Sequence, residues 1–196
     1  MAINHNVPYF SQEDNEIEPW RTCGATSSAM CLKYFKVPDL GSLPQYEDDV
    51  KERFDKLRLN HGVPDDIRTL LEGLGLRDDL TLNGSLSNIT RSLDYGKICI
   101  LHGYWTASGH ILVIRGYHKN GNFFVNDPTG EWFYDGYRKN SSFSPDNQGE
   151  NKLYSRRLIS AAANAFSLDQ AFEFYDNWGS SEIESTATMW LHRVSK

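Results

Sequence analysis

The fold of this chain follows from residues 21–30, which read Arg21-Thr22-Cys23-Gly24-Ala25-Thr26-Ser27-Ser28-Ala29-Met30. A polar approach leads to a Cys-Gly pair and then to a helical pattern, whose apolar positions are Ala25, Ala29, Leu32 and Phe35. This spacing follows the 3.6-residue period of an α-helix, so it predicts a helix that begins at Cys23. Because residues 27 and 28 are both small, we expect this helix to pack tightly in the middle of a domain.

Cys23 would then lie at the N-terminus of the helix. The aligned peptide dipoles favour negative charge there, so a thiolate is stabilised and the pKa of the thiol falls. Gly24 has no Cβ, so another backbone or a substrate can come close. The alternative is a structural cysteine, since free Cys is one of the most buried residue types. The rest of the chain decides between the two interpretations.

Length and composition describe a globular protein. The 196 residues suffice for one domain with a good core, or for two small ones. Hydrophobic residues make up 39% of the chain, and its formal net charge is −6. A nucleic-acid-binding protein usually carries a basic face, and no block of basic residues is present, so we expect no nucleic-acid partner.

The number and spacing of the cysteines argue against a disulfide-bonded fold and against a structural zinc site. Three is an odd number and too few for a disulfide framework, and no spacing of Cys and His fits structural zinc. We interpret Cys31 and Cys99 as core residues. The run Glu47-Asp48-Asp49 is interpreted as a helix surface rather than a calcium site. We therefore expect no metal and no cofactor.

The N-terminus has neither the basic region nor the apolar region of a signal peptide, and no apolar run approaches the length of a membrane span. We expect synthesis in the cytoplasm, where a thiolate can stay reduced.

Apolar patterns along the chain predict one α+β domain over residues 1–196, with helices first and an antiparallel sheet after them. The predicted helices are residues 46–59, 67–74, 85–95 and 154–166, with a less distinct aromatic segment at 169–178. The predicted strands are an edge strand at 7–10, a short one at 80–82, and residues 97–101, 111–117, 122–127 and 186–194. Residues 139–151 form a polar loop, and residues 139–196 complete the fold or contribute to substrate binding.

A hairpin brings a histidine and an aspartate to one face of the sheet. His110 begins the strongly β-prone run 111–117, and Asp127 ends the next run, because Pro128 cannot continue the ladder. A two-residue loop at Asn120-Gly121 places Asp127 opposite Ile114, and the Asn-Gly pair favours it. A four-residue loop, residues 117–120, places Asp127 opposite His110, and a Cys-His-Asp function favours it. In both registers residues 110 and 127 share a face.

These residues suggest a catalytic set. Cys23 would be the nucleophile, His110 the general base and later the acid, and Asp127 the group that orients the imidazole. Gln12, eleven residues before Cys23, could donate its side-chain N–H to an oxyanion beside the backbone N–H of Cys23. Each also has a plainer interpretation. Gln12 could be a loop residue, His110 a hydrogen-bonded strand-edge histidine and Asp127 a turn residue.

The segments 7–15, 23–30, 109–117 and 125–128 resemble those of C39-like cysteine peptidases, a family of the papain-like superfamily. The resemblance covers about residues 7–130. It implies a central helix that carries the nucleophile, packed on an antiparallel sheet that carries His and Asp. It also implies that Cys23, His110 and Asp127 form the triad and that Gln12 completes the oxyanion hole.

The resemblance favours a thiol hydrolase that cleaves an amide bond in a peptide. Several stand-alone relatives are bacterial or phage cell-wall hydrolases, so the favoured substrate is a peptidoglycan peptide. An endolysin of this kind would be released from the cytoplasm to act on the cell wall. The alternatives are a protease or effector acting on a host or leader protein, and a non-catalytic peptide-binding module of the same fold.

Overall fold

The structure, a computed structural model, describes residues 2–133, 136–137 and 149–196. Its helices are α1 (Cys23–Tyr34), α2 (Tyr46–Lys56), α3 (Pro64–Gly73), α4 (Leu86–Asp94), α5 (Arg156–Asn164), α6 (Leu168–Asn177) and α7 (Ser180–Ser185). Its strands are β1 (Ile3–Asn4), β2 (Arg77–Asp78), β3 (Thr81–Gly84), β4 (Ile98–Gly103), β5 (His110–Tyr117), β6 (Phe123–Asn126), β7 (Trp132–Phe133), β8 (Gly136–Tyr137), β9 (Lys152–Tyr154) and β10 (Met189–Ser195). The predicted α+β class is confirmed.

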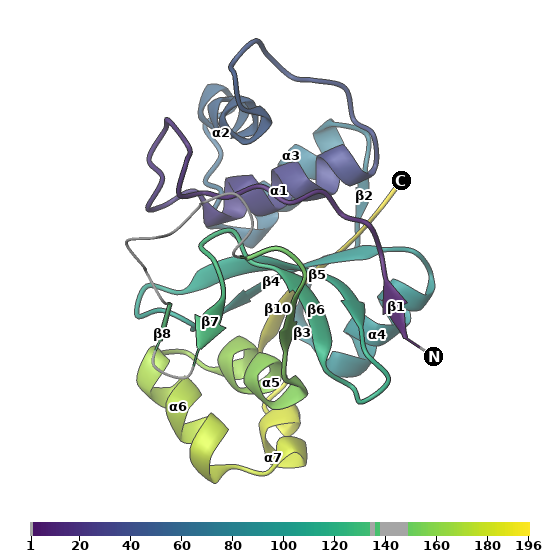
Figure 1. Ribbon diagram of the computed structural model, residues 1–196, viewed down its shortest axis with the longest axis vertical. Coiled ribbons are helices and arrows are strands. Elements are labelled where there is room, and N and C mark those ends of the chain that lie inside the picture. The colour runs from purple at the N-terminus through teal and green to yellow at the C-terminus, as the bar shows by residue number, and fades with distance from the viewer. Residues whose placement is uncertain (1, 134–135, 138–148) are drawn as a thin grey trace.

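An antiparallel sheet forms the middle layer, in the order β2-β10-β4-β5-β6-β9, with β1 on β5 and β3 on β10. Helices α1, α2 and α3 lie on one side of this sheet, and α5, α6 and α7 lie on the other (Figure 1). The last strand, β10, lies between β4 and the short strands β2 and β3. Residues from the end of the described chain therefore form an interior strand of the sheet.

The two-residue period of the central strands divides the core into two layers. On β4, Ile98 and Ile100 join the core cluster that includes α1, α2 and α3, whereas Cys99 and Leu101 join the cluster that includes α4 and α5. Strand β5 alternates in the same way. Because both faces of the sheet are covered, β4 and β5 read as continuous apolar runs rather than as alternating ones.

Helix α1 begins at Cys23, as the sequence predicts, and it is buried along most of its length. Residues 24–32 are all buried, and Ser27 Oγ donates a hydrogen bond of 3.2 Å to the carbonyl oxygen of Ile111 on β5. The small residues of α1 let it approach the sheet this closely. It lies between the sheet and α2, so it is the central helix that the resemblance implies.

The hairpin between β5 and β6 adopts neither predicted register. Tyr117 pairs with Phe123 and Gly116 with Phe124, but a bulge at Arg115 then shifts the pairing, so Val113 faces Asn126. Continued by one residue, this register places Asp127 opposite Leu112, one diagonal step from His110. Residues 110 and 127 still share a face. The extra residue of the bulge changes the register by one, so Asp127 faces residue 112, which lies on the same face of β5 as residue 110.

Three other sequence expectations are wrong. Residues 7–10 form no strand; they run beside β6, where the Asn126 side chain donates to the carbonyl oxygens of Val7 and Pro8. The acidic residues at the start of α2 are buried rather than solvated, with 4% of Glu47 and 1% of Asp48 exposed. The predicted helix at 154–166 begins only at Arg156, after strand β9.

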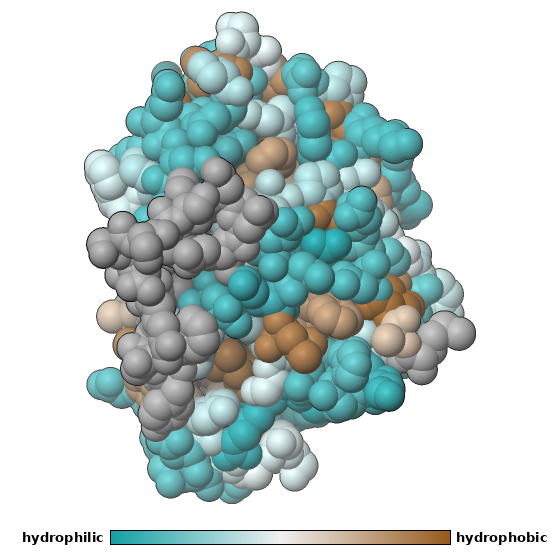
Figure 2. Space-filling model, viewed as in Figure 1, coloured by the Kyte–Doolittle hydropathy of each residue, from teal (hydrophilic) through white to brown (hydrophobic). Residues whose placement is uncertain are grey.

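Residues 139–148 of the predicted polar loop lie outside the described residues. Figure 2 shows that the coloured part of one face of the molecule is mostly hydrophilic, with hydrophobic residues in small separate groups. Within the described ranges, no helix combines the length and the apolar character that crossing a bilayer requires.

Candidate active site

Cys23 lies at the first position of α1 and is partly exposed, whereas Cys31 and Cys99 are fully buried. Behind it, Gly24 packs against the carbonyl oxygen of His61; a Cβ at position 24 would lie 1.8 Å from that oxygen. Only glycine fits this contact. The close backbone approach expected at Gly24 is therefore present, and it fixes the helix start against the loop before α3.

His110 is the first residue of β5, is 4% exposed, and lies between Cys23 and Asp127. Its Nε2 is 2.8 Å from Asp127 Oδ1. With Nε2 engaged by the carboxylate, Nδ1 is the ring nitrogen left to face the thiol, and the His110 side chain hydrogen-bonds to Cys23. The structure thus brings together three residues that are distant in sequence.

The charges of this trio favour a thiolate–imidazolium pair. Burial alone would raise the pKa of the Cys23 thiol, but the hydrogen bond and charge of His110, together with the backbone of Ile111 and Gly24, lower it below its ordinary value. Burial would lower the pKa of His110, but the charge and hydrogen bond of Asp127, and the contact with Cys23, raise it to about 10. A proton can therefore rest on the imidazole while the sulfur is negative.

Asp127 is fully buried directly after β6, and residues from several segments hold its carboxylate. The backbone N–H of Thr129 donates to Oδ1 at 3.1 Å, and the hydroxyl of Tyr154 donates to Oδ2 at 2.8 Å. Sequence reasoning missed Tyr154, because it placed this residue at the start of a helix. Only the pairing of β9 with β6, Tyr154 against Phe123, brings it to the site.

Gln12 is buried on the segment that runs beside Pro128, and its backbone N–H donates to the carbonyl oxygen of that proline at 2.8 Å. Its side-chain Nε2 donates to the carbonyl oxygen of Pro19 at 2.8 Å, and its Oε1 has no hydrogen-bond partner among the described residues. A primary amide carries two hydrogens, so one remains after the bond to Pro19.

A cleft of about 270 Å³ opens beside the thiol. It is lined by the start of α1 and the chain before it, the loop before α3, the end of β4, and the start of β5 with the segment before it: Trp20, Arg21, Cys23, Asn60, His61, Gly62, His102, Ser108, Gly109, His110 and Ile111. Trp20 is 74% exposed at its rim. The cleft is large enough for part of a peptide and holds both the sulfur and the imidazole.

His102 lines the same cleft and is held rigidly by aromatic neighbours. Its ring stacks on Trp190, with centroids 4.7 Å apart, and meets the edge of Tyr104. Burial and the nearby charge of His110 lower the pKa of His102 to about 4, so it stays neutral at physiological pH. Its neutral imidazole lies in the cleft that Cys23 and His110 also line.

A second buried histidine lies behind Trp190 and takes no part in the cleft. The indole N–H of Trp190 donates to His192 Nε2 at 2.7 Å, and His192 Nδ1 lies 2.5 Å from Asp78 Oδ2. Because an indole nitrogen only donates, His192 Nε2 must be unprotonated, and Nδ1 carries the hydrogen given to Asp78. The sequence shows no acidic partner for His192, because Asp78 is 114 residues away.

A partly exposed thiol at a helix N-terminus, bonded to an imidazole that a buried carboxylate holds, is an arrangement that cysteine peptidases use. The Peptidase C39-like family matches residues 4–156, and the chain belongs to this family. No curated protein matches the chain.

Solved structures with a similar fold have low sequence identity. A C39-like peptidase from Bacillus anthracis aligns with a TM-score of 0.54 and 14% identity, over 100% of this chain and 98% of that one. A double-glycine-motif protease from an AMS/PCAT transporter, in complex with its leader peptide, aligns with a TM-score of 0.48 and 12% identity, over 100% of this chain and 99% of that one. The first of these similarities supports the C39-like fold.

Proposed function

We propose that this protein is a thiol hydrolase that cleaves an amide bond in peptides, with Cys23 as nucleophile, His110 as acid and base, and Asp127 as the group that orients His110. The observation that carries this proposal is the bond from His110 to Asp127, 2.8 Å long, with the Cys23 thiol on the other side of the same ring. Family membership supports the same chemistry.

The proposed reaction begins when the Cys23 thiolate attacks the carbonyl carbon of the scissile amide. The oxyanion that forms is stabilised by the backbone N–H of Cys23 and by the second N–H of the Gln12 amide. The His110 imidazolium gives its proton to the departing amine, and a thioester remains on Cys23. Water then loses a proton to His110 and attacks the thioester, whose C–S bond breaks and restores the Cys23 thiolate beside the His110 imidazolium. The products are an amine and a carboxylic acid.

The proposed substrate is a peptide of bacterial peptidoglycan, in the stem or in a cross-bridge. The first support is the resemblance to C39-like peptidases, which implies such a substrate because several stand-alone members of that family are cell-wall hydrolases. The second is the charge of the cleft, where the exposed side chain of Arg21 can pair with a carboxylate. Stem peptides carry such carboxylates.

Digestion of purified peptidoglycan by the wild type and by Cys23→Ala, with mass spectrometry of the fragments, tests both parts of the proposal. New amine ends released by the wild type alone would establish a cell-wall amide hydrolase and identify the bond. Release by Cys23→Ala at a comparable rate would contradict the assignment of the nucleophile.

A protein substrate is the second candidate, because the cleft is open and Trp20 stands exposed at its rim. If neither protein releases wall fragments while Cys23 is still alkylated rapidly at neutral pH, the peptidoglycan proposal fails. A library of unfolded proteins would then replace the cell wall as substrate. A protein that binds peptides without cleaving them in either assay would be the non-catalytic module.

A further inference from the structure

The carboxylate of Asp127 is held by a tyrosine whose role the triad alone does not explain. Tyr154 ends β9, is 2% exposed, and places its hydroxyl 2.8 Å from Asp127 Oδ2. The other carboxylate oxygen, Oδ1, faces His110. Tyr154 and His110 therefore hold the two ends of one carboxylate, and a rotation of that carboxylate would break both bonds.

The direction of the Tyr154 hydrogen bond follows from its neighbours. The backbone N–H of Trp132 lies 2.7 Å from the phenol oxygen and can only donate, so the oxygen accepts there. The phenol hydrogen is then left for Asp127 Oδ2 at 2.8 Å or for the carbonyl oxygen of Gly130 at 3.4 Å. The carboxylate is closer and charged, so it takes the hydrogen.

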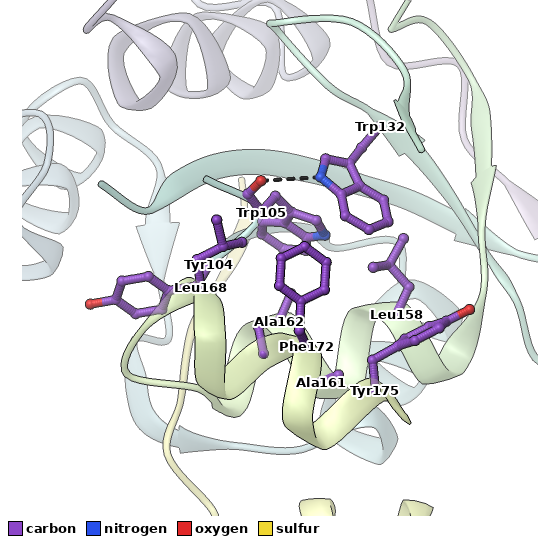
Figure 3. A pocket seen from close by; sticks show the side chains of 10 residues that line it. Tyr104, Trp105, Trp132, Leu158, Ala161, Ala162, Leu168, Phe172 and Tyr175 are labelled. Atoms are coloured by element: carbon purple, nitrogen blue, oxygen red, sulfur yellow. Dashed lines mark hydrogen bonds between the residues drawn. The ribbon is translucent and has the colours of Figure 1, made fainter. Parts of the chain in front are cut away.

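Trp132 is itself anchored. Its indole N–H donates to the carbonyl oxygen of Trp105 at 3.1 Å, shown by the dashed line in Figure 3. The surrounding pocket is closely filled by aromatic and aliphatic side chains of α5, α6 and the segment after β4, including Tyr104, Leu158, Phe172 and Tyr175 (Figure 3). Its free volume is about 10 Å³, about the size of one water probe, so the Trp132 ring has little room to move.

We propose that Tyr154, held by Trp132, is a positioning residue that fixes the Asp127 carboxylate so that Oδ1 stays aimed at His110. The inference rests on the proposed function, because it assigns Tyr154 to the same Cys23–His110 pair. Tyr154 is not among the described residues that line the cleft, and its hydroxyl bonds to Asp127, so it acts through Asp127.

Loss of the Tyr154 hydrogen bond would also change the ionisation of the Cys23 sulfur. When the phenol hydrogen is lost, the carboxylate can turn, and its bond to the His110 imidazolium weakens. The thiolate–imidazolium pair then loses part of its stabilisation, and less thiolate is present at neutral pH. At alkaline pH the thiol ionises without help, so the difference should disappear.

The test is the rate of Cys23 alkylation by iodoacetamide between pH 5 and pH 10 in the wild type, Tyr154→Phe and Tyr117→Phe. Tyr117 is the matched control, because its hydroxyl donates to Asp94 Oδ1 at 2.6 Å, away from the cleft. Peptide mass spectrometry separates Cys23 from Cys31 and Cys99, which are fully buried and should react slowly.

We expect Tyr154→Phe to slow alkylation at neutral pH by about tenfold, the usual effect of a hydrogen bond to a charged group, and to match the wild type at pH 10. Tyr117→Phe should follow the wild type throughout. If the pH dependence of Cys23 alkylation in Tyr154→Phe equals that of the wild type, the inference is overturned and the proposed function stays intact. A wild type that reacts no faster at neutral pH than an ordinary thiol would overturn the proposed function, and the inference with it.

Rapid alkylation of Cys31 and Cys99 in Tyr154→Phe would show that this variant is unfolded. The comparison then uses Trp132→Phe. This variant keeps Tyr154 but removes the indole N–H that anchors residue 132, whose backbone N–H bonds to the Tyr154 hydroxyl. The same shift toward alkaline pH, smaller in size, supports the proposal, and an unchanged curve in the folded variant contradicts it.

Discussion

Asp127 is the residue on which the account of the site depends most. It has no exposed surface, and its carboxylate accepts hydrogen bonds from His110, the Thr129 backbone and Tyr154. A charge so buried is tolerated only when hydrogen bonds replace its water. The same bonds set the direction in which the carboxylate faces His110.

Asp127→Asn should therefore reduce activity without abolishing it. The amide can still contact the imidazole, but it carries no charge to stabilise the imidazolium, and its NH₂ must face His110 or Tyr154. We expect kcat/KM to fall on the order of a hundredfold, with Cys23→Ala falling below detection. Asp94→Asn, which changes a carboxylate bonded to Tyr117 outside the site, is the control and should keep wild-type kinetics. Equal losses in the two Asn variants would contradict the role given to Asp127.

Residue patterns predicted some members of the site and could not predict others. Cys23 and His110 each begin a regular element, and that position is visible in the local sequence. Tyr154 and the partner of His192 are different, because each contact joins segments that only the sheet brings together. No local period carries that information, so these contacts could not be inferred from residue spacing.

At the scale of elements, the start of α1 depends on one glycine. A Cβ at residue 24 would lie 1.8 Å from the carbonyl oxygen of His61, so Gly24→Ala must displace the loop that lines the cleft. We expect Gly24→Ala to lower the free energy of unfolding by about 1–3 kcal/mol, a cost typical of overpacking.

The control for that substitution is Gly73→Ala, at the end of α3, where no atom lies within 4 Å of the added Cβ. It should be neutral or slightly stabilising, since alanine restricts the unfolded chain. Urea denaturation measures both variants. Equal stability of the two would show that the contact between α1 and the loop does not constrain the fold.

Helix α2 carries a pH-dependent destabilisation. Burial, with the charges of Asp14 and Asp48, raises the pKa of Glu47 from 4.5 to about 7. The folded state therefore keeps a proton that the unfolded state has lost, and stability falls as pH rises from 4.5 to 7. We expect Glu47→Gln to be more stable than the wild type above pH 7, by up to about 3 kcal/mol, and equal to it near pH 4.

Glu52→Gln is the matched control on the same helix, because Glu52 forms only a surface pair with Lys56. Such pairs contribute little, so its stability should differ from that of the wild type by less than about 1 kcal/mol at every pH. Urea denaturation at four or five pH values measures both. A constant difference between Glu47→Gln and the wild type across this range would refute the role of burial.

The element boundaries show where sequence patterns lose precision. The hairpin between β5 and β6 was predicted with two alternative registers, and the bulge at Arg115 produces a third. Arg115 is 5% exposed, and it donates to the His5 carbonyl oxygen and to Asn126 Oδ1. These tertiary contacts hold the extra residue, so turn propensity at Asn120-Gly121 does not decide the pairing.

In the whole molecule, β10 pairs with β4 on one side and with the short strands β2 and β3 on the other. Its residue His192 has no exposed surface and bonds to Asp78 of β2. The sequence predicted a strand at residues 186–194. A periodic pattern of residues does not indicate which strands are neighbours in a sheet. That β10 lies beside β4 could be learned only from the structure.

Removing one member of the Asp78–His192 pair should be costly. His192→Ala removes one hydrogen-bond donor from the buried Asp78 carboxylate, which keeps the bond from the Arg193 backbone N–H, and we expect the free energy of unfolding to fall by about 1.5–3 kcal/mol. The double variant Asp78→Leu with His192→Leu should recover much of that loss. The pH profile of Cys23 alkylation should stay unchanged in folded protein, because this pair lies outside the cleft. Urea denaturation measures the stability of both variants. A double variant less stable than His192→Ala would contradict the predicted cost of leaving Asp78 without the His192 hydrogen bond.

Whether His110 holds Cys23 as a thiolate is measured by the pKa of the Cys23 thiol in the wild type and in His110→Ala. The pH dependence of Cys23 alkylation gives both values. We predict a pKa below the ordinary thiol value in the wild type and above it in His110→Ala, where burial acts without the imidazolium. The same pKa in both proteins would contradict the account.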